Sequence, residues 1–209
     1  MELLLIRHAL PVRRELTSGV ADPELSDDGR AQAEHLAAYL SSEHLDAIYA
    51  SPLQRARQTA DAIARHHGLA VTLHDGIAEF DRLSSDYVPT EELKAENDPR
   101  YHAILAGEWD NDEESSVEFR ARVLSSIEQL IDAHPGQRIA VVCHGGVINS
   151  YLSHVLGLVL ARGGFFYPNY TSINRIAAAR GGIRSIVTIN ETSHLRGTGL
   201  PMGLFQGQR

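Results

Sequence analysis

The sequence predicts an α/β fold, a three-layer sandwich whose mostly parallel sheet carries helices on both faces. Short apolar runs such as Leu3–Ile6 and Ile139–Cys143 are bounded by turn residues, which is typical of buried strands. Between these runs lie segments in which apolar residues recur at helical spacing. Strands that alternate with helices favour a parallel sheet, because each crossover helix returns the chain to the end of the sheet where the previous strand began, so the next strand runs in the same direction.

Each predicted element has its own local signals. Ser26 is a candidate N-cap, and Ser51-Pro52 predicts a helix capped by serine with proline in its first position. Gly68 and the stretch His134-Pro135-Gly136 end helices, and Gly181-Gly182 is the turn of a closing hairpin. In chain order we expect strand 3–6, a helix around 33–40, strand 45–50, a helix around 53–64, strand 70–73, helix 117–131, strand 139–143, helix 146–156 and a hairpin of 173–179 with 183–189.

Two segments interrupt this alternation. Residues 80–114 are polar and acidic, contain two prolines and show no clear strand, so we interpret them as a lid inserted over the crevice. Residues 196–209 carry four glycines, and we expect this tail to be loosely ordered. We see no internal repeat and no second domain.

Composition narrows the range of partners. The chain has 209 residues, 43% of them hydrophobic, and can bury one sizeable core. With 19 Lys and Arg against 27 Asp and Glu, its net charge of -8 argues against nucleic acid and anionic membranes as partners. A single cysteine suits a reducing compartment, and the apolar start is too short for a signal peptide or a membrane span. We therefore expect a soluble cytoplasmic protein whose oligomeric state, a homodimer included, stays open.

Two histidines stand at the ends of predicted strands. Arg7-His8 follows the first apolar run, and His144-Gly145-Gly146 follows the run that ends at Cys143. The carboxyl ends of parallel strands open onto the crevice where ligands bind. His144 also precedes a predicted helix, whose N-terminal N–H groups and dipole favour an anion. Histidine and arginine together at this edge indicate chemistry on an anion, with phosphate as the first candidate.

Three stretches together resemble the histidine phosphatase superfamily, which includes the cofactor-dependent phosphoglycerate mutases. Leu5-Ile6-Arg7-His8 matches its Arg-His signature, Ser51–Ala60 is similar to its second motif, and Val142–Val147 is similar to its third. The motifs stand in the family's order, and the resemblance extends from residue 3 to about Leu195. We therefore expect one histidine-phosphatase-like domain over residues 1–195, with the tail 196–209 outside it.

The resemblance implies a role for each matched residue. His8 attacks phosphorus and becomes a phosphohistidine, which requires a neutral ring whose other nitrogen donates to a fixed acceptor such as a backbone carbonyl. Arg7 and Arg55 hold the phosphate oxygens. His144, as an imidazolium, holds further oxygens of the transferring group, and Gly145 allows close approach of the backbone.

A leaving alkoxide needs a proton, and the attacking water must later lose one, so the reaction needs a carboxylic acid. The family takes it from a glutamate shortly after the third strand, and Ile77-Ala78-Glu79 fits that position. We assign the role to Glu79 and keep Asp81, two residues on, as the alternative. Arg57 is interpreted as a solvated helix residue, whereas Arg13 and Arg14 are assigned either to the substrate or to the surface.

Other chemistries fit less well. Cys143 lacks the arginine six residues later that a tyrosine-phosphatase loop needs, because position 149 is Asn. The remaining histidines lack the spacing of a metal site, and neither a Walker A loop nor a GxGxxG motif is present. We therefore predict an enzyme without metal or cofactor.

The predicted function is a phosphomonoesterase that hydrolyses a small phosphate ester through a phosphohistidine on His8. Two alternatives stay open, namely phosphoglycerate mutase-type phosphoryl transfer and a catalytically weak protein that binds a phosphorylated ligand. Discrimination between esters must come from the walls of the crevice. Their candidates are Arg13-Arg14, the lid, and the stretch Phe165-Phe166-Tyr167 with Tyr170-Thr171-Ser172. An acidic lid and nearby aromatic residues favour a small, partly apolar monophosphate.

Overall fold

The computed structural model describes residues 1–106, 114–158 and 164–204. Its centre is a six-stranded sheet with the strand order β4-β3-β6-β1-β7-β8. The parallel strands are β1 (Glu2–Arg7), β3 (Ala47–Ala50), β4 (Val71–Leu73) and β6 (Arg138–Cys143), and an antiparallel hairpin of β7 (Ile173–Ala178) and β8 (Arg184–Glu191) completes one edge. The predicted mostly parallel sheet is confirmed.

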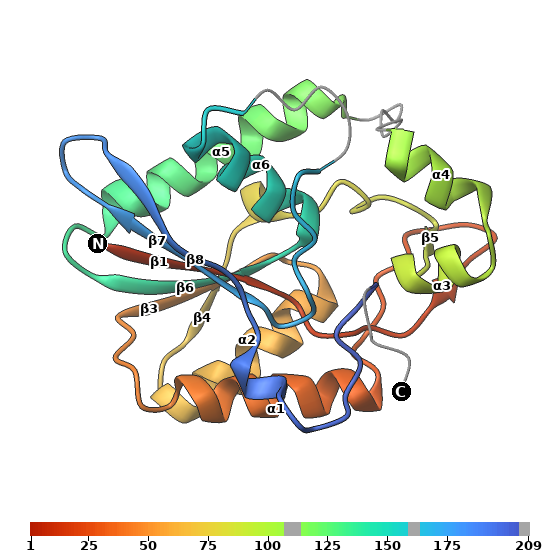
Figure 1. Cartoon of the computed structure of the whole chain (residues 1–209), viewed down its shortest axis with the longest axis horizontal. Coiled ribbons are helices and arrows are strands. Elements are labelled where there is room, and N and C mark those ends of the chain that lie inside the picture. The colour runs from red at the N-terminus through yellow and green to blue at the C-terminus, as the bar shows by residue number, and fades with distance from the viewer. Residues whose placement is uncertain (107–113, 159–163, 205–209) are drawn as a thin grey trace.

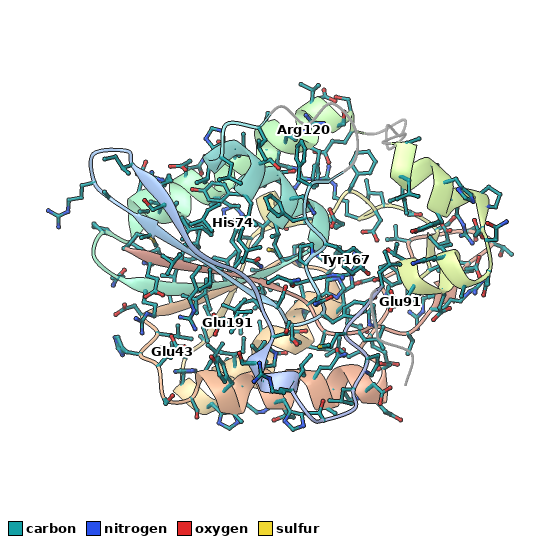
Figure 2. All side chains as sticks on the ribbon, in the orientation of Figure 1. Glu43, His74, Glu91, Arg120, Tyr167 and Glu191 are labelled. Atoms are coloured by element: carbon teal, nitrogen blue, oxygen red, sulfur yellow. The ribbon has the colours of Figure 1, made fainter. Side chains whose placement is uncertain are left out.

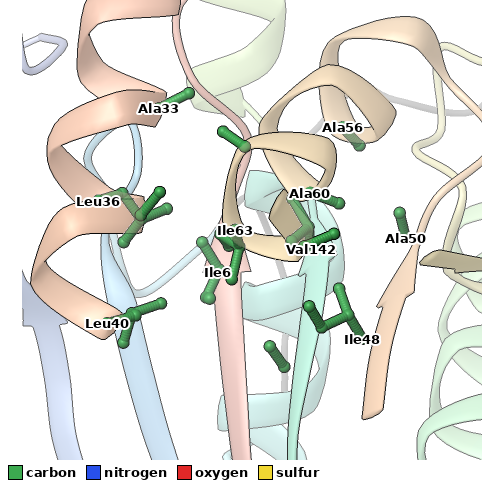
Figure 3. Close-up of a cluster of buried hydrophobic side chains, with 14 of the residues drawn as sticks. Ile6, Ala33, Leu36, Leu40, Ile48, Ala50, Ala56, Ala60, Ile63 and Val142 are labelled. Atoms are coloured by element: carbon green, nitrogen blue, oxygen red, sulfur yellow. The ribbon is translucent and has the colours of Figure 1, made fainter. Parts of the chain in front are cut away.

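Helices cover both faces of this sheet, as predicted (Figure 1). One face packs against α1 (Asp27–Leu40) and α2 (Gln54–His67), and the other against α5 (Ser116–Ala133) and α6 (Gly145–Val155). Side chains of β1 alternate between the two layers: Leu4 and Ile6 join the first cluster, part of which Figure 3 shows, while Leu3 and Leu5 join the second. Because a strand buried on both faces needs apolar residues throughout, β1 has a continuous apolar run.

The start of α2 differs from the prediction. We expected Ser51 to cap this helix and Pro52 to occupy its first position, but α2 begins at Gln54 and Leu53 is its N-cap. The Leu53 carbonyl accepts the first helical hydrogen bonds, and its side chain makes no capping bond. The Ser51 side chain instead bonds to His144 across the sheet, so a tertiary contact replaces the predicted local one.

The lid segment, residues 80–114, lies beyond the carboxyl ends of the parallel strands (Figure 1). It contains α3 (Thr90–Ala95), α4 (Pro99–Ala106) and the short strand β5 (Asp86–Tyr87), which pairs with β2 (Arg14–Glu15). The expectation that this segment holds no strand is corrected by β5, whose two residues are too few to leave a sequence pattern. Residues 107–113 of the lid lie outside the described residues.

The tail differs from the prediction as well. The remaining elements of the described chain are two short 3-10 helices, η1 (Asp75–Ile77) and η2 (Ser193–Leu195). Beyond η2, the chain returns toward the carboxyl ends of the parallel strands (Figure 1). There the carbonyl of Met202 accepts from Tyr170 N at 3.0 Å, and Leu204 N donates to the Tyr167 hydroxyl at 3.1 Å. We expected loose order from Arg196 onward, but these hydrogen bonds join residues 202 and 204 to the core. Residues 205–209 lie outside the described part of the chain. In the described ranges, no helix combines the length and apolar character that a membrane crossing requires.

Candidate active site

His8 and His144 meet because they follow two neighbouring parallel strands. The register of β1 and β6 pairs Arg7 with Cys143, the last residues of the two strands. The backbone N–H of His8 donates to the Cys143 carbonyl at 2.9 Å, and the two imidazole ring centres lie 5.1 Å apart. The sheet therefore brings together two histidines that are far apart in the sequence.

The surroundings of His8 suit a nucleophile. Its Nδ1 lies 2.8 Å from the carbonyl oxygen of Ala9; a carbonyl only accepts, so Nδ1 carries the hydrogen and Nε2 keeps the lone pair. Thr59 Oγ1 holds this turn by accepting from Ala9 N at 3.0 Å. Burial, followed by the positive charges of Arg55 and Arg7, lowers the pKa of His8 well below its usual range. The ring is therefore neutral at physiological pH.

Arg7 is buried beside His8 with a side chain only 7% exposed. Its Nη1 donates to the Pro168 carbonyl at 2.7 Å, and its guanidinium lies over the rings of Tyr170 and Tyr167, at 4.1 and 5.6 Å from their centres. Such cation–π contacts fix the plane of the guanidinium. Figure 2 shows Tyr167 toward the same end of the molecule as Glu91 of the lid.

Arg55, on the first turn of α2, is the second buried arginine and is 1% exposed. Its Nη2 donates to Asp81 at 2.7 Å, and its guanidinium lies 4.6 Å from the ring centre of Tyr87. Both partners belong to the lid, so the lid holds this arginine from the crevice side. Asp81 is thereby engaged in an ion pair, whereas Glu79 faces no arginine within ion-pair distance among the described residues.

At the candidate site, three of the buried side-chain nitrogens lack a hydrogen-bond partner within the described part of the chain. They are Nε of Arg7, Nε of Arg55 and Nδ1 of His144. Native proteins rarely leave buried polar groups unpaired, and such groups cost free energy. The two arginine nitrogens can only donate, and they carry positive charge, so they suit an acceptor and an anionic one best.

Glu79 lies at the start of α6, where its Oε2 accepts from Gly146 N at 2.8 Å and its Oε1 accepts from Phe80 N at 3.0 Å. Burial and the nearby charge of Asp81 raise the pKa of Glu79 above its usual value. A raised pKa enlarges the fraction of a carboxyl group that holds a proton at a given pH, as a general acid requires. Glu79 therefore has the environment of a general acid.

The glycines of the third motif have different surroundings. A Cβ on Gly146 would lie 2.5 Å from Glu79 Oε1, so only glycine fits there while the carboxylate stays in place. A Cβ on Gly145 would meet nothing nearer than Arg7 Nε at 4.0 Å, which means that the described protein atoms leave room beside Gly145. The predicted role of Gly145 toward a ligand stays a prediction, and Gly146 is a position that the sequence analysis did not assign.

His144 is fully buried and is the N-cap of α6, which places it before a helix as predicted. Its charge was expected to be that of an imidazolium holding phosphate oxygens, which stays a prediction. Burial and the charges of Arg55 and His8 lower its pKa well below the usual range, which favours a neutral ring. An imidazolium here would add a third positive charge beside two buried arginines.

Several other residues now have a place. Arg13 forms ion pairs with Glu15 of β2 at 2.7 Å and with two lid residues, Glu92 at 3.5 Å and Glu96 at 2.6 Å. Arg14 and Arg57 are exposed. Cys143 is buried in β6, and burial raises the pKa of its thiol. No group of three or more His, Cys, Asp or Glu side chains is arranged to hold a metal ion in the ranges that the structure describes. The assignment of Arg13 to the substrate is not supported.

Ser51, Thr59 and Tyr87 contact the site but were not assigned to it from the sequence. Ser51 and Thr59 lie within the second motif, where their spacing around Arg55 was the available signal. Tyr87 lies in the lid, where no periodicity marks a contact with Arg55. Only the fold shows which lid residue reaches the crevice.

The fold and the site together define an α/β protein with a neutral histidine and two buried arginines at the carboxyl ends of its parallel strands. The sequence profile of the histidine phosphatase superfamily (branch 1) matches residues 3–192. This chain belongs to that superfamily. The match covers all three motifs and the lid between them.

Individual relatives include both phosphatases and a mutase-like protein. Phosphoserine phosphatase 1 of Hydrogenobacter thermophilus is 33% identical over 175 residues, which cover 78% of this chain and 79% of the relative. Phosphoglycerate mutase-like protein 4 of Arabidopsis thaliana is 31% identical over 217 residues, covering 100% of this chain and 93% of the relative. Among solved structures, a variant of the Entamoeba histolytica phosphoserine phosphatase in complex with phosphoserine has a TM-score of 0.73 and 26% identity, and covers 93% of this chain and 98% of that chain.

Proposed function

We propose that this protein is a phosphomonoesterase that hydrolyses a small phosphate ester through a phosphohistidine on His8. The observation that carries the proposal is the set of three unpartnered nitrogens, on Arg7, Arg55 and His144, beside a neutral His8. A phosphoryl group supplies the anionic acceptors that these nitrogens lack. The phosphoserine phosphatases among the relatives support hydrolysis over isomerisation.

The reaction proceeds in two transfers. In the first, Nε2 of His8 forms a bond to phosphorus while the bond to the ester oxygen breaks, and Glu79 gives its proton to the leaving alkoxide. In the second, Glu79 as a carboxylate takes a proton from water, whose oxygen attacks phosphorus and displaces Nε2 of His8. Arg7 and Arg55 offset the charge of the phosphoryl oxygens in both steps. Free phosphate and neutral His8 are regenerated.

We further propose that this reaction needs no metal ion and no cofactor. Metal ions in phosphoryl transfer neutralise the oxygens and position them. Here the two arginine side chains, 7% and 1% exposed, supply permanent positive charge in a site with little competing water. Activity in the presence of EDTA is therefore expected.

The proposed substrate class rests on the lid residues and tyrosines that contact Arg7 and Arg55. On the lid, Asp81 contacts Arg55 and Glu91 contacts the Tyr170 hydroxyl, while the rings of Tyr87 and Tyr170 lie against the two arginines. Carboxylates repel a substrate tail with a net negative charge, whereas the tail of O-phosphoserine carries an ammonium beside its carboxylate and is net neutral. We propose a small monophosphate, with O-phosphoserine as the first candidate because of the phosphoserine phosphatases among the relatives. A single domain over residues 1–195, a cytoplasmic location and a homodimeric assembly are further proposals from the sequence.

The test is to trap the intermediate. Brief incubation with a ³²P-labelled ester, with EDTA present, followed by an alkaline quench is expected to leave an acid-labile label on the wild type and none on His8→Ala. A parallel assay with 3-phosphoglycerate separates release of inorganic phosphate from isomerisation. Isomerisation without phosphate release, or ester binding without turnover, would contradict the proposal.

A further inference from the structure

Ser51 lies in line with the two histidines. It follows β3 directly, and β3 is the neighbour of β6, so the ends of three adjacent parallel strands present Ser51, His144 and His8. Ser51 is fully buried, and its N–H donates to the carbonyl of Val142 at 3.0 Å. Its Oγ lies 2.7 Å from Nε2 of His144, a short distance for a hydrogen bond between side chains.

The direction of this hydrogen bond follows from the other contacts of Ser51. Its Oγ accepts from the backbone N–H of Leu53 at 3.3 Å, and among the described residues Nε2 of His144 is the one acceptor that its buried hydroxyl contacts. The lowered pKa of His144 favours a neutral ring, in which one of the two nitrogens carries a lone pair. When Ser51 donates to Nε2, that lone pair is on Nε2 and the ring hydrogen is on Nδ1.

The second ring nitrogen supports the same direction. Nδ1 of His144 is buried and has no partner within the described part of the chain. The same holds for the Nε atoms of Arg7 and Arg55. With the hydrogen on Nδ1, all three nitrogens are donors and suit one anionic ligand. With the hydrogen on Nε2, the site would instead present a lone pair to the phosphate oxygens, which is repulsive.

We propose that Ser51 is a positioning residue that fixes the tautomer of His144, so that the neutral imidazole donates Nδ1–H to an oxygen of the phosphoryl group. This inference rests on the proposed function, because it assigns the phosphate as the acceptor. The hydrogen bond between Ser51 and His144 thus supplies an N–H donor of fixed direction, without adding a third positive charge beside the two arginines. Preorganised donors of this kind stabilise charge that develops in a transition state.

The experiment compares Ser51→Ala, Ser51→Thr and Ser153→Ala with the wild type. Ser153 is a matched control because it is also buried and its hydroxyl has no partner in the described ranges, yet it lies within α6 rather than at the strand ends. Removal of one preorganised donor lowers kcat by about 10²–10³-fold in known cases, and we expect a loss of about 10- to 100-fold for Ser51→Ala, where the donor remains but is no longer fixed. Ser51→Thr keeps the hydroxyl and is expected to restore most of kcat, while Ser153→Ala changes little.

The direct measurement is ¹⁵N NMR of the His144 ring with and without inorganic phosphate. The wild type is expected to show protonated Nδ1 and unprotonated Nε2 in both states, and Ser51→Ala to show a mixture of tautomers. Protonated Nε2 in the wild type, an imidazolium in the phosphate complex, or a Ser51→Ala enzyme that equals Ser153→Ala would overturn the inference. Because the NMR measurement uses phosphate and needs no turnover, an inactive wild type with the expected tautomer would contradict the proposed function alone.

Discussion

Arg55 donates through Nη2 to both carboxylate oxygens of Asp81, at 2.7 and 3.0 Å, although Arg55 itself is only 1% exposed. The same Asp81 charge adds to burial in raising the pKa of Glu79. One ion pair thus links Arg55, the proposed phosphate ligand, with the start of the lid and the proposed proton donor. A change at Asp81 is therefore expected to affect the protonation of Glu79 as well as the position of Arg55.

Asp81→Asn is expected to shift the pH profile of kcat. Glu79 donates its proton only while protonated, so kcat on an alkyl phosphate falls as the pH rises through the pKa of Glu79. Removing the Asp81 charge lowers that pKa, and the alkaline limb therefore moves to lower pH. Glu92→Gln is the control, since the Glu92 side chain is 43% exposed and pairs with Arg13. A limb that moves to higher pH would contradict the assignment of Glu79.

Glu79→Gln is expected to slow alkyl phosphates far more than aryl phosphates. Aryl leaving groups need little protonation, whereas an alkoxide needs a proton, and general acid catalysis contributes about 10²–10⁴-fold. The measurement is kcat on ethyl phosphate and on p-nitrophenyl phosphate for Glu79→Gln and Asp81→Asn. Should the leaving-group dependence appear in Asp81→Asn instead, the proton donor is Asp81.

Gly146→Ala is expected to displace Glu79. The added Cβ would lie 2.5 Å from Oε1, closer than real contacts allow, so the carboxylate loses its place against the helix N-terminus. We expect a loss of about 10²-fold in kcat on alkyl phosphates, at the lower end of the contribution of a general acid. Gly181→Ala serves as the control because nothing lies within 4 Å of a Cβ there. Full activity of Gly146→Ala would show that Glu79 is not held as described.

Glu91 is expected to select against anionic substrate tails. Its Oε2 accepts from the hydroxyl of Tyr170 at 3.3 Å, and the Tyr170 ring lies against Arg7, so this carboxylate belongs to the crevice wall. Glu91→Gln removes a negative charge that attracts the ammonium of phosphoethanolamine and repels the carboxylate of phosphoglycolate. The ratio of kcat/KM for phosphoethanolamine to kcat/KM for phosphoglycolate is expected to fall about tenfold, which is the size of the interaction between unit charges several ångströms apart at intermediate dielectric. Glu92→Gln, one residue on, is expected to leave the ratio unchanged. An unchanged ratio in Glu91→Gln would place the selectivity elsewhere.

Much of the fold could be predicted from local signals. The apolar run of β1, the stripe of α1 and the glycine at the end of α2 each reflect a physical demand that neighbouring residues meet by themselves. Where a signal was ambiguous, the prediction was wrong. Ser51 resembled an N-cap because its partner, His144, follows another strand and cannot be seen in a local stretch of sequence. The tail from Arg196 resembled a loose end because the bond between Met202 and Tyr170 joins residues far apart in the sequence.

The sequence by itself determined the class of fold, the three motifs and the residue types at the strand ends. Only the tertiary structure decided their charges and partners: that burial lowers the pKa of His144, that Ser51 bonds to it, that Asp81 pairs with Arg55 and that Gly146 makes room for Glu79. The reason is physical. Secondary structure follows from interactions a few residues apart, whereas burial, hydrogen-bond direction and pKa depend on groups that the sheet brings together from distant parts of the chain.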